Sequence, residues 1–479
     1  MKLVLLLVII TFATSIGCQS NAETKKGEID KPNILYIILD DLGYGDVGFN
    51  GQDKILTPRI DQLAKEGIVF TNHYAGAPVC GPSRAVLMTG KHLGHCTVRG
   101  NPRWSLSGNP VDIDSTDVTI AEELRRAGYA TAIIGKWGLA ENLSHGRPNQ
   151  QGFDYFYGFN RHLPAHHYYP EQVYRNEELI SIEGNVTVEK KGQYITDLFT
   201  QEAKQYIRQV AKQEQPFYLH LAYTTPHYEL TIPAERKALY QDKDWPMREM
   251  KAGHYLNDKN GHVTYASMVS DVDRQIGEVL DVLDELKIAE NTLVVFTSDN
   301  GHEYDLLTDE FFNSNGDGRG RKRDLYEGGI KVPFAARWPK HIAPNTTSSH
   351  VSAFWDFLPT VCEITGLEPS DKSIDGLSFL PALTGNAKEQ EQHSYLYWEF
   401  NESKGQVQAL RKGDWKLLRF VAQNKVELYK ITTDMSEIQN VAEKYPDKCQ
   451  ELLALLDKAR TEHPQFPLTK RSNPYKKKK

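Results

Sequence analysis

Short apolar runs and amphipathic stretches alternate along most of the chain. Runs rich in branched and aromatic residues predict strands, and apolar positions spaced three or four residues apart predict helices. The predicted strands are residues 33–39, 130–134, 216–222, 292–297 and 333–336. The predicted helices are residues 57–65, 119–127, 197–212 and 267–286. This alternation is typical of an α/β fold, with a large, mostly parallel sheet flanked by helices.

The pattern changes after a polar stretch at residues 384–393. Four short apolar runs follow, at 395–400, 406–410, 415–420 and 427–430, and then an amphipathic stretch at 447–462. Closely spaced short runs predict an antiparallel sheet, and the last stretch predicts a closing helix. We therefore predict a large domain over residues 32–385, a small C-terminal α+β subdomain over 394–465 and a solvated basic tail over 466–479.

The N-terminus has the pattern of an export signal. Lys2 precedes an apolar run at residues 3–12 and then small residues, which predicts a signal peptide over 1–17. The run is too short for a membrane span. The sequence Ser-Ile-Gly before Cys18 fits a relaxed bacterial lipobox, so Cys18 is predicted to carry a lipid that anchors the protein to the membrane, followed by a polar tether over 18–31. The expected location is the periplasm or the cell surface.

Composition narrows the class of protein. The chain has 479 residues, of which 40% are apolar and 25% charged, as in soluble proteins with a large core. The net charge of −7 argues against nucleic acid as a partner, and it requires a local basic cluster to attract any anionic substrate. The widely spaced Cys96, Cys362 and Cys449 indicate neither a disulfide framework nor a metal knuckle.

Two acidic doublets follow predicted strands. Asp40 and Asp41 come after the first strand, and Asp299 and Asn300 come after the strand at 292–297. Ligand sites in open α/β sheets gather at the carboxyl ends of strands, so the doublets can share one cation. Oxygen ligands alone suit a hard ion, calcium or magnesium. Each doublet taken alone is equally well explained as turn chemistry, since Asp and Asn before Gly are common in turns.

A further motif begins at Cys80, in the run Cys80-Gly81-Pro82-Ser83-Arg84. Pro82 suits the first turn of a helix, and Gly90 can end it. Cys80 would then lie at a helix N-terminus, which favours anions, and Arg84 would offer a planar donor to an oxyanion one turn later. The simpler alternative is a helix cap followed by a packed helix.

Together with the two doublets, this run resembles the type I sulfatase family of the alkaline-phosphatase superfamily, over about residues 32–420. The resemblance implies an alkaline-phosphatase-like sandwich, and formylglycine made from Cys80 by a formylglycine-generating enzyme. It also implies one calcium ion held by the residue-80 oxygen with Asp40, Asp41, Asp299 and Asn300. A hydrated aldehyde has one hydroxyl to attack sulfur and a second that helps to expel sulfate, which a thiol lacks.

The resemblance assigns three more residues. Lys136, in a second signature at residues 128–137, would contact sulfate, Lys322 would bridge sulfate and nucleophile, and His227 would protonate the leaving oxygen. Isolated lysines and histidines are usually surface residues, and only the register shared with the family argues otherwise. The predicted catalytic set is Cys80, Arg84, Lys136, His227 and Lys322.

The chain departs from the family at one position. The second signature usually ends in a histidine that acts as a base for sulfate release, and Gly138 stands there instead. Another histidine, metal-polarised water or the substrate itself can take its place. His95 is the leading replacement because its loop follows the helix of the nucleophile; His92, His162, His166, His167 and His302 also lie in loops. The run at 161–169, which contains His166, is either a wall that binds the sugar or an ordinary surface loop.

These patterns predict an exported, calcium-dependent sulfatase that acts on a sulfated carbohydrate. Two alternatives remain open at this point. One is a phosphonate monoester hydrolase or phosphodiesterase with the same fold and nucleophile motif. The other is a catalytically silent glycan-binding lipoprotein, which the absence of the histidine makes conceivable. Comparing the turnover of an aryl sulfate with that of an aryl phosphonate distinguishes the first alternative from a sulfatase. Binding of a sulfated sugar without desulfation would indicate the second.

Overall fold

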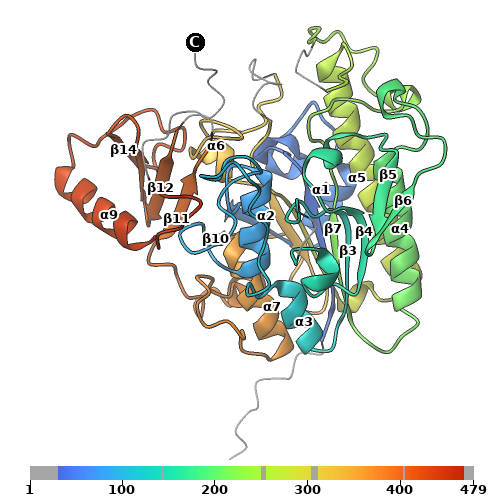
Figure 1. The fold of residues 1–479 in the computed structure, drawn as a ribbon, viewed down its shortest axis with the longest axis horizontal. Coiled ribbons are helices and arrows are strands. Elements are labelled where there is room, and N and C mark those ends of the chain that lie inside the picture. The colour runs from blue at the N-terminus through green and yellow to red at the C-terminus, as the bar shows by residue number, and fades with distance from the viewer. Residues whose placement is uncertain (1–30, 143–144, 250–254, 304–310, 403–404, 469–479) are drawn as a thin grey trace, which may run out of the picture. The chain divides into compact units, whose positions relative to one another are not determined.

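The computed structural model describes residues 31–142, 145–249, 255–303, 311–402 and 405–468 (Figure 1). The predicted signal peptide, Cys18 and most of the basic tail lie outside these residues. Within the described ranges, every helix is too short or too polar to span a membrane.

A ten-stranded sheet forms the centre of the fold, in the order β10-β2-β9-β8-β1-β7-β3-β4-β5-β6 (Figure 1). Its strands are β1 (Asn33–Leu39), β2 (Ile68–Tyr74), β3 (Ala130–Lys136), β4 (Tyr155–Phe159), β5 (Gln172–Arg175), β6 (Glu178–Ser181), β7 (Phe217–Ala222), β8 (Thr292–Ser298), β9 (Phe334–Arg337) and β10 (Thr346–Ala353). The five neighbours β8, β1, β7, β3 and β4 are mutually parallel, whereas β9, β5 and β6 run antiparallel to their neighbours. The predicted mostly parallel sheet is confirmed.

Helices cover both faces of this sheet. Leu35, Ile37 and Leu39 of β1 pack into one core with α1 (Pro58–Lys65), α4 (Ile195–Val210) and α5 (Gly261–Glu285). The ring of Tyr36 points to the other face, where it lies 4.6 Å from the ring of Phe357 in α7 (Phe357–Thr365). On that face, α7 packs against α2 (Cys80–Thr89) and α3 (Ile120–Arg126). Successive strand residues point to opposite faces, so both faces of β1 are apolar, as in other parallel sheets.

A second, four-stranded antiparallel sheet follows, in the order β11-β12-β13-β14 (Figure 1). Its elements are β11 (Leu396–Phe400), β12 (Val407–Lys412), β13 (Trp415–Phe420), β14 (Lys425–Lys430) and the helix α9 (Pro446–Lys458). The predicted antiparallel sheet and closing helix are both confirmed. Two short helices, α6 (Glu327–Ile330) and α8 (Leu380–Leu383), precede it in the chain.

Candidate active site

Four adjacent strands bring the predicted site residues together. Asp40 and Asp41 directly follow β1, and Asp299 and Asn300 follow β8, its neighbour in the sheet. Lys136 is the last residue of β3, and His227 lies in the loop after β7. Since these strands are parallel, their carboxyl ends share one edge of the sheet, which is where sites form in this class of fold.

Cys80 begins α2, as predicted, and its Sγ lies 3.9 Å from Oδ1 of Asp41. The helix ends at Gly90, which adopts a left-handed conformation with φ of 67°. The Ser83 hydroxyl donates a hydrogen bond to the backbone oxygen of Asp299 at 2.6 Å, which ties the first turn of the helix to the carboxylates. The Gly81 N–H donates to Oδ1 of Asn101 at 3.0 Å. The motif thus fixes Cys80 at the edge of the acidic cluster.

The acidic side chains form a buried cluster that fits a cation. Potential ligand atoms of Asp40, Asp41, Cys80 and Asp299 all lie within 4.8 Å of one another. The buried oxygens Oδ1 of Asp40 and Oδ1 of Asn300 accept no hydrogen bond from the described residues. Burial raises the pKa of Asp41 to about 8 and that of Asp299 to about 6, and neighbouring carboxylates add to both shifts. Crowded carboxylates with unsatisfied oxygens suit a hard cation such as calcium or magnesium.

Two cationic side chains, Lys136 of β3 and Arg84 of α2, form ion pairs with this cluster. The fully buried Lys136 donates from Nζ to Oδ2 of Asp40 at 2.6 Å. Burial alone would raise the pKa of Asp40, but Lys136 and Arg84 instead lower it well below its usual range. Arg84 donates to Oδ2 of Asp299 at 3.0 and 2.8 Å and to the backbone oxygen of Lys136 at 2.7 Å. Arg84 therefore orients the carboxylates, and its predicted contact with an anion stays a prediction.

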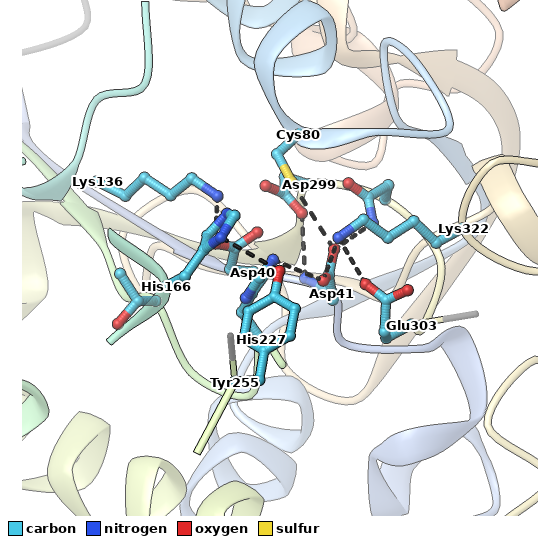
Figure 2. Close-up of polar contacts among 12 residues, drawn as sticks. Asp40, Asp41, Cys80, Lys136, His166, His227, Tyr255, Asp299, Glu303 and Lys322 are labelled. Atoms are coloured by element: carbon cyan, nitrogen blue, oxygen red, sulfur yellow. Dashed lines mark hydrogen bonds and ion pairs between the residues drawn. The ribbon is translucent and has the colours of Figure 1, made fainter. Parts of the chain in front are cut away.

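Lys322 approaches the cluster from the opposite side (Figure 2). Its Nζ donates to Oδ2 of Asp41 and to Oε2 of Glu303, the latter at 2.8 Å. Arg323 donates to the other oxygen of Glu303, also at 2.8 Å. Glu303 was not predicted, although it follows Asp299 by only four positions. Its carboxylate orients Lys322, which leaves the buried ammonium between two acidic groups.

A group of aromatic and imidazole rings lies on the third side (Figure 2). Nε2 of His227 is 3.5 Å from Oδ2 of Asp41, as expected for a residue that acts at the reacting centre. The ring of His166 stacks on that of His227, with centroids 4.3 Å apart, and its Nδ1 lies 3.2 Å from the hydroxyl oxygen of Tyr255. His166 thus lies beside His227, and its predicted role in binding substrate stays a prediction. Tyr255 carried no signal in the sequence.

The expectation that His95 lies beside Cys80 is wrong. Its Nδ1 lies 2.8 Å from Oδ1 of Asp375, and its ring stacks on His92 with centroids 4.7 Å apart. The loop of His95 leaves the C-terminal end of α2, whereas Cys80 lies at the N-terminal end. Ten helical residues separate the two ends by about 15 Å. The loop that follows α2 begins at the end of the helix opposite Cys80. Asp375 holds the His95 imidazole near that end.

The sequence also matches known protein families. The family model described as Sulfatase matches residues 32–367. A second model, N-sulphoglucosamine sulphohydrolase, C-terminal, matches residues 318–463. The fold and the site define an alkaline-phosphatase-like hydrolase of sulfuric esters. The chain belongs to the sulfatase family.

Several relatives extend over nearly the whole chain. N-acetylgalactosamine-6-sulfatase of Mus musculus is 30% identical over 469 residues, covering 94% of this chain and 84% of its own. N-acetylgalactosamine-6-O-sulfatase of Bacteroides thetaiotaomicron is 28% identical, covering 93% and 96%. The crystal structure of Ps i-CgsB in complex with k-i-k-neocarrahexaose has a TM-score of 0.75 and 30% identity, covering 92% and 95%. Phosphonate monoester hydrolase of Agrobacterium radiobacter shares the fold at 21% identity.

Proposed function

We propose that this sulfatase is exported, depends on calcium and removes sulfate from sulfated glycans through a formylglycine made from Cys80. The observation that carries the proposal is the position of Cys80. It lies at the N-terminus of α2, against Asp41 and within reach of the other cluster ligands. Cations surround the same point, so a sulfate group can bind next to residue 80.

The environment of Cys80 disfavours an unmodified thiol as the nucleophile. Burial raises the pKa of the thiol well above its ordinary value, and Asp40 adds to the shift. The thiol therefore stays protonated at neutral pH, and a protonated thiol is a poor nucleophile. The hydrated aldehyde of a formylglycine would supply a hydroxyl nucleophile and a second hydroxyl for turnover.

The residues around the cluster would have different roles in the reaction. Asp40, Asp41, Asp299 and Asn300 would hold calcium, which would supply positive charge to the nucleophile and the sulfate. Lys136 and Lys322 approach from opposite sides and would bind sulfate oxygens, keeping sulfur in line for attack (Figure 2). His227 would donate a proton to the departing sugar oxygen.

The glycan part of the proposal rests on the relatives and on the rings beside the site. Two relatives are named for 6-sulfated N-acetylgalactosamine, and one solved structure holds a carrageenan oligosaccharide. The rings of His166 and Tyr255, tilted with respect to each other with centroids 5.7 Å apart, would border a sugar ring next to His227. The export pattern before residue 31, with its predicted lipid at Cys18, would bring the enzyme to extracellular polysaccharides.

One preparation tests these points together. The protein is made with its leader in a bacterial host that installs formylglycine, and sulfated mono- and disaccharides are compared with an aryl phosphonate. Desulfation of sugars is expected, with Cys80→Ala inactive. Peptide mass should show the aldehyde at residue 80 and a lipidated N-terminal Cys18. Full activity in Cys80→Ala, faster turnover of the phosphonate, or a chain that still begins at Met1 would each contradict the corresponding part.

A further inference from the structure

We propose that His162 is the imidazole base that replaces the histidine missing at Gly138. This inference rests on the proposed sulfatase function, because it assigns a step of that reaction. His162 follows β4, and Gly138 follows β3. These are neighbouring parallel strands, so the two loops leave the sheet at the same edge.

Backbone hydrogen bonds hold the two loops side by side. The Trp137 N–H donates to the oxygen of Phe159 at 3.0 Å, and the Gly138 N–H donates to the oxygen of Asn160 at 3.2 Å. Beyond this pair, the backbone N–H of His162 donates to the carboxylate of Glu141. The backbone of His162 is therefore anchored to Glu141, in the loop that contains Gly138, and the residues just before it are anchored to Trp137 and Gly138.

The ring of His162 fills the space that a side chain at position 138 would enter. A Cβ built on Gly138 would lie 3.5 Å from Nδ1 of His162 and 3.7 Å from Cε of Lys136. A Cβ built on Gly81, next to Cys80, would lie 3.9 Å from the oxygen of Gly138. This space is thus bordered by Lys136 and by the first turn of α2. An imidazole placed there from either loop would lie beside Lys136.

The His162 ring is a neutral imidazole whose Nδ1 is free to accept a proton. Its Nδ1 is buried and has no hydrogen-bond partner among the described residues. Burial and then Lys136 lower the pKa of His162 well below its ordinary value, so the ring is neutral at pH 7 and keeps a free lone pair. Its ring packs edge-on against His166, with centroids 5.1 Å apart, and His166 in turn stacks on His227. The proposed base and acid therefore lie on either side of His166, in one group of three rings.

The assigned step is a proton transfer during sulfate release. Nδ1 accepts the proton of the remaining hydroxyl on the processed residue 80. The electron pair of that O–H bond forms the carbonyl, and the pair of the breaking C–O bond leaves with sulfate. The imidazolium then returns its proton to water. Charge balances, and no further reactant is needed.

The test uses a reciprocal exchange. His162→Ala should slow turnover of a sulfated sugar by about 10²–10⁴-fold, the usual contribution of a positioned base. Gly138→His alone should also be impaired, because its ring competes with His162 for one space and φ at this glycine is 72°. Adding His162→Ala to Gly138→His should recover activity relative to His162→Ala. His145→Ala, at an exposed loop histidine, is the matched control and should behave as wild type.

Two readouts do not depend on turnover. After a rapid quench, the peptide containing residue 80 should retain sulfate in His162→Ala and in the milder His162→Gln, but not in His145→Ala. In unprocessed protein, the NMR signal of the His162 ring should be that of a neutral imidazole at pH 7. Wild-type turnover in both His162 variants, without retained sulfate, would overturn the assignment. Failure of the proposed function looks different, because wild type itself would then release no sulfate.

Discussion

At the scale of single residues, Asp299 connects the predicted metal site to the cations. It belongs to the acidic cluster and accepts two hydrogen bonds from the buried Arg84. Asp299→Ala should abolish calcium binding and remove the carboxylate that accepts two hydrogen bonds from the buried guanidinium. Breaking a buried ion pair costs about 3–5 kcal/mol. We expect the melting temperature of wild type to fall on chelation and that of Asp299→Ala to be low with or without calcium.

An exposed aspartate provides the control for this prediction. Asp53 forms only a surface ion pair with Lys54, at 3.6 Å. Asp53→Ala should keep the calcium response and the activity of wild type, since surface pairs contribute little. Calcium content and a calcium-dependent melting temperature that survive in Asp299→Ala would show that the cluster is not the metal site.

The residues that sequence could identify share a simple property. Asp40, Asp299 and Lys136 lie at or directly after strands, so their order along the chain matches their place at the sheet edge. Tyr255 reaches the site from the long segment between β7 and α5, and His162 follows β4 by three positions. The contacts of both residues depend on the folded path of the chain. His95 is the opposite case. It is close to Cys80 in sequence, but α2 separates the two residues in the folded chain. Loop residues therefore had to be located in the structure.

At the scale of elements, strands with strong apolar runs were predictable, and edge strands were not. β1 and β8 are buried, except for the partly buried Asn33, and each contains an uninterrupted apolar run. β10 lies at the end of the sheet, and its sequence TTSSHVSA is mostly polar, so no pattern marks it as a strand. β4 is only five residues long and contains a glycine. Pairing with neighbours, and not local composition, makes such segments into strands.

A buried ion pair joins two of these elements and gives an element-scale prediction. Lys416 of β13 is fully buried and donates to Oε1 of Glu327, the first residue of α6, at 2.8 Å. Lys416→Ala should destabilise the protein by about 3–5 kcal/mol, because it leaves the Glu327 carboxylate buried without its cation. Urea unfolding measures the loss. Activity should fall as well, because Glu327 follows Lys322 by five positions.

The same sheet offers a matched control. Lys412 of β12 forms an ion pair with Glu451 of α9 at 2.8 Å, but its side chain is 44% exposed. Lys412→Ala should cost no more than about 1 kcal/mol. Equal losses for the two variants would mean that burial of the Lys416 pair does not determine its contribution.

At the scale of the whole molecule, the alternation of strands and helices was enough to predict the α/β class and the second, antiparallel sheet. The order of strands in the sheet could not be predicted from the sequence, because it depends on which crossover connections the chain makes. β1 lies between β7 and β8, two strands from much later in the chain. That order is what brings Asp40 beside Asp299, so the metal site is a property of the complete fold.

The complete fold also buries histidines outside the predicted catalytic set, and this predicts a response to pH. Burial lowers the pKa of both His73 and His220 to about 3, with small additions from His350 and Arg84. In the unfolded chain these groups titrate near pH 6.5, as is usual for histidine. The unfolded state therefore binds more protons below that pH. Their contribution to stability is complete above pH 6.5 and is lost as the pH falls from there toward 3.

The free energy of unfolding, measured in urea with saturating calcium, should thus decrease by up to about 1.4 kcal/mol per pH unit for each histidine between pH 6.5 and 5.5. A His73→Gln and His220→Gln double variant should be less stable at pH 7.5 but should depend less steeply on pH, because it has lost both titrating groups. His145→Ala, which removes an exposed histidine, should keep the wild-type slope. If the double variant keeps that slope too, the acid sensitivity of the protein arises from other groups, and the two buried rings stabilise it only through packing and their hydrogen bonds to Ser352 and Tyr218.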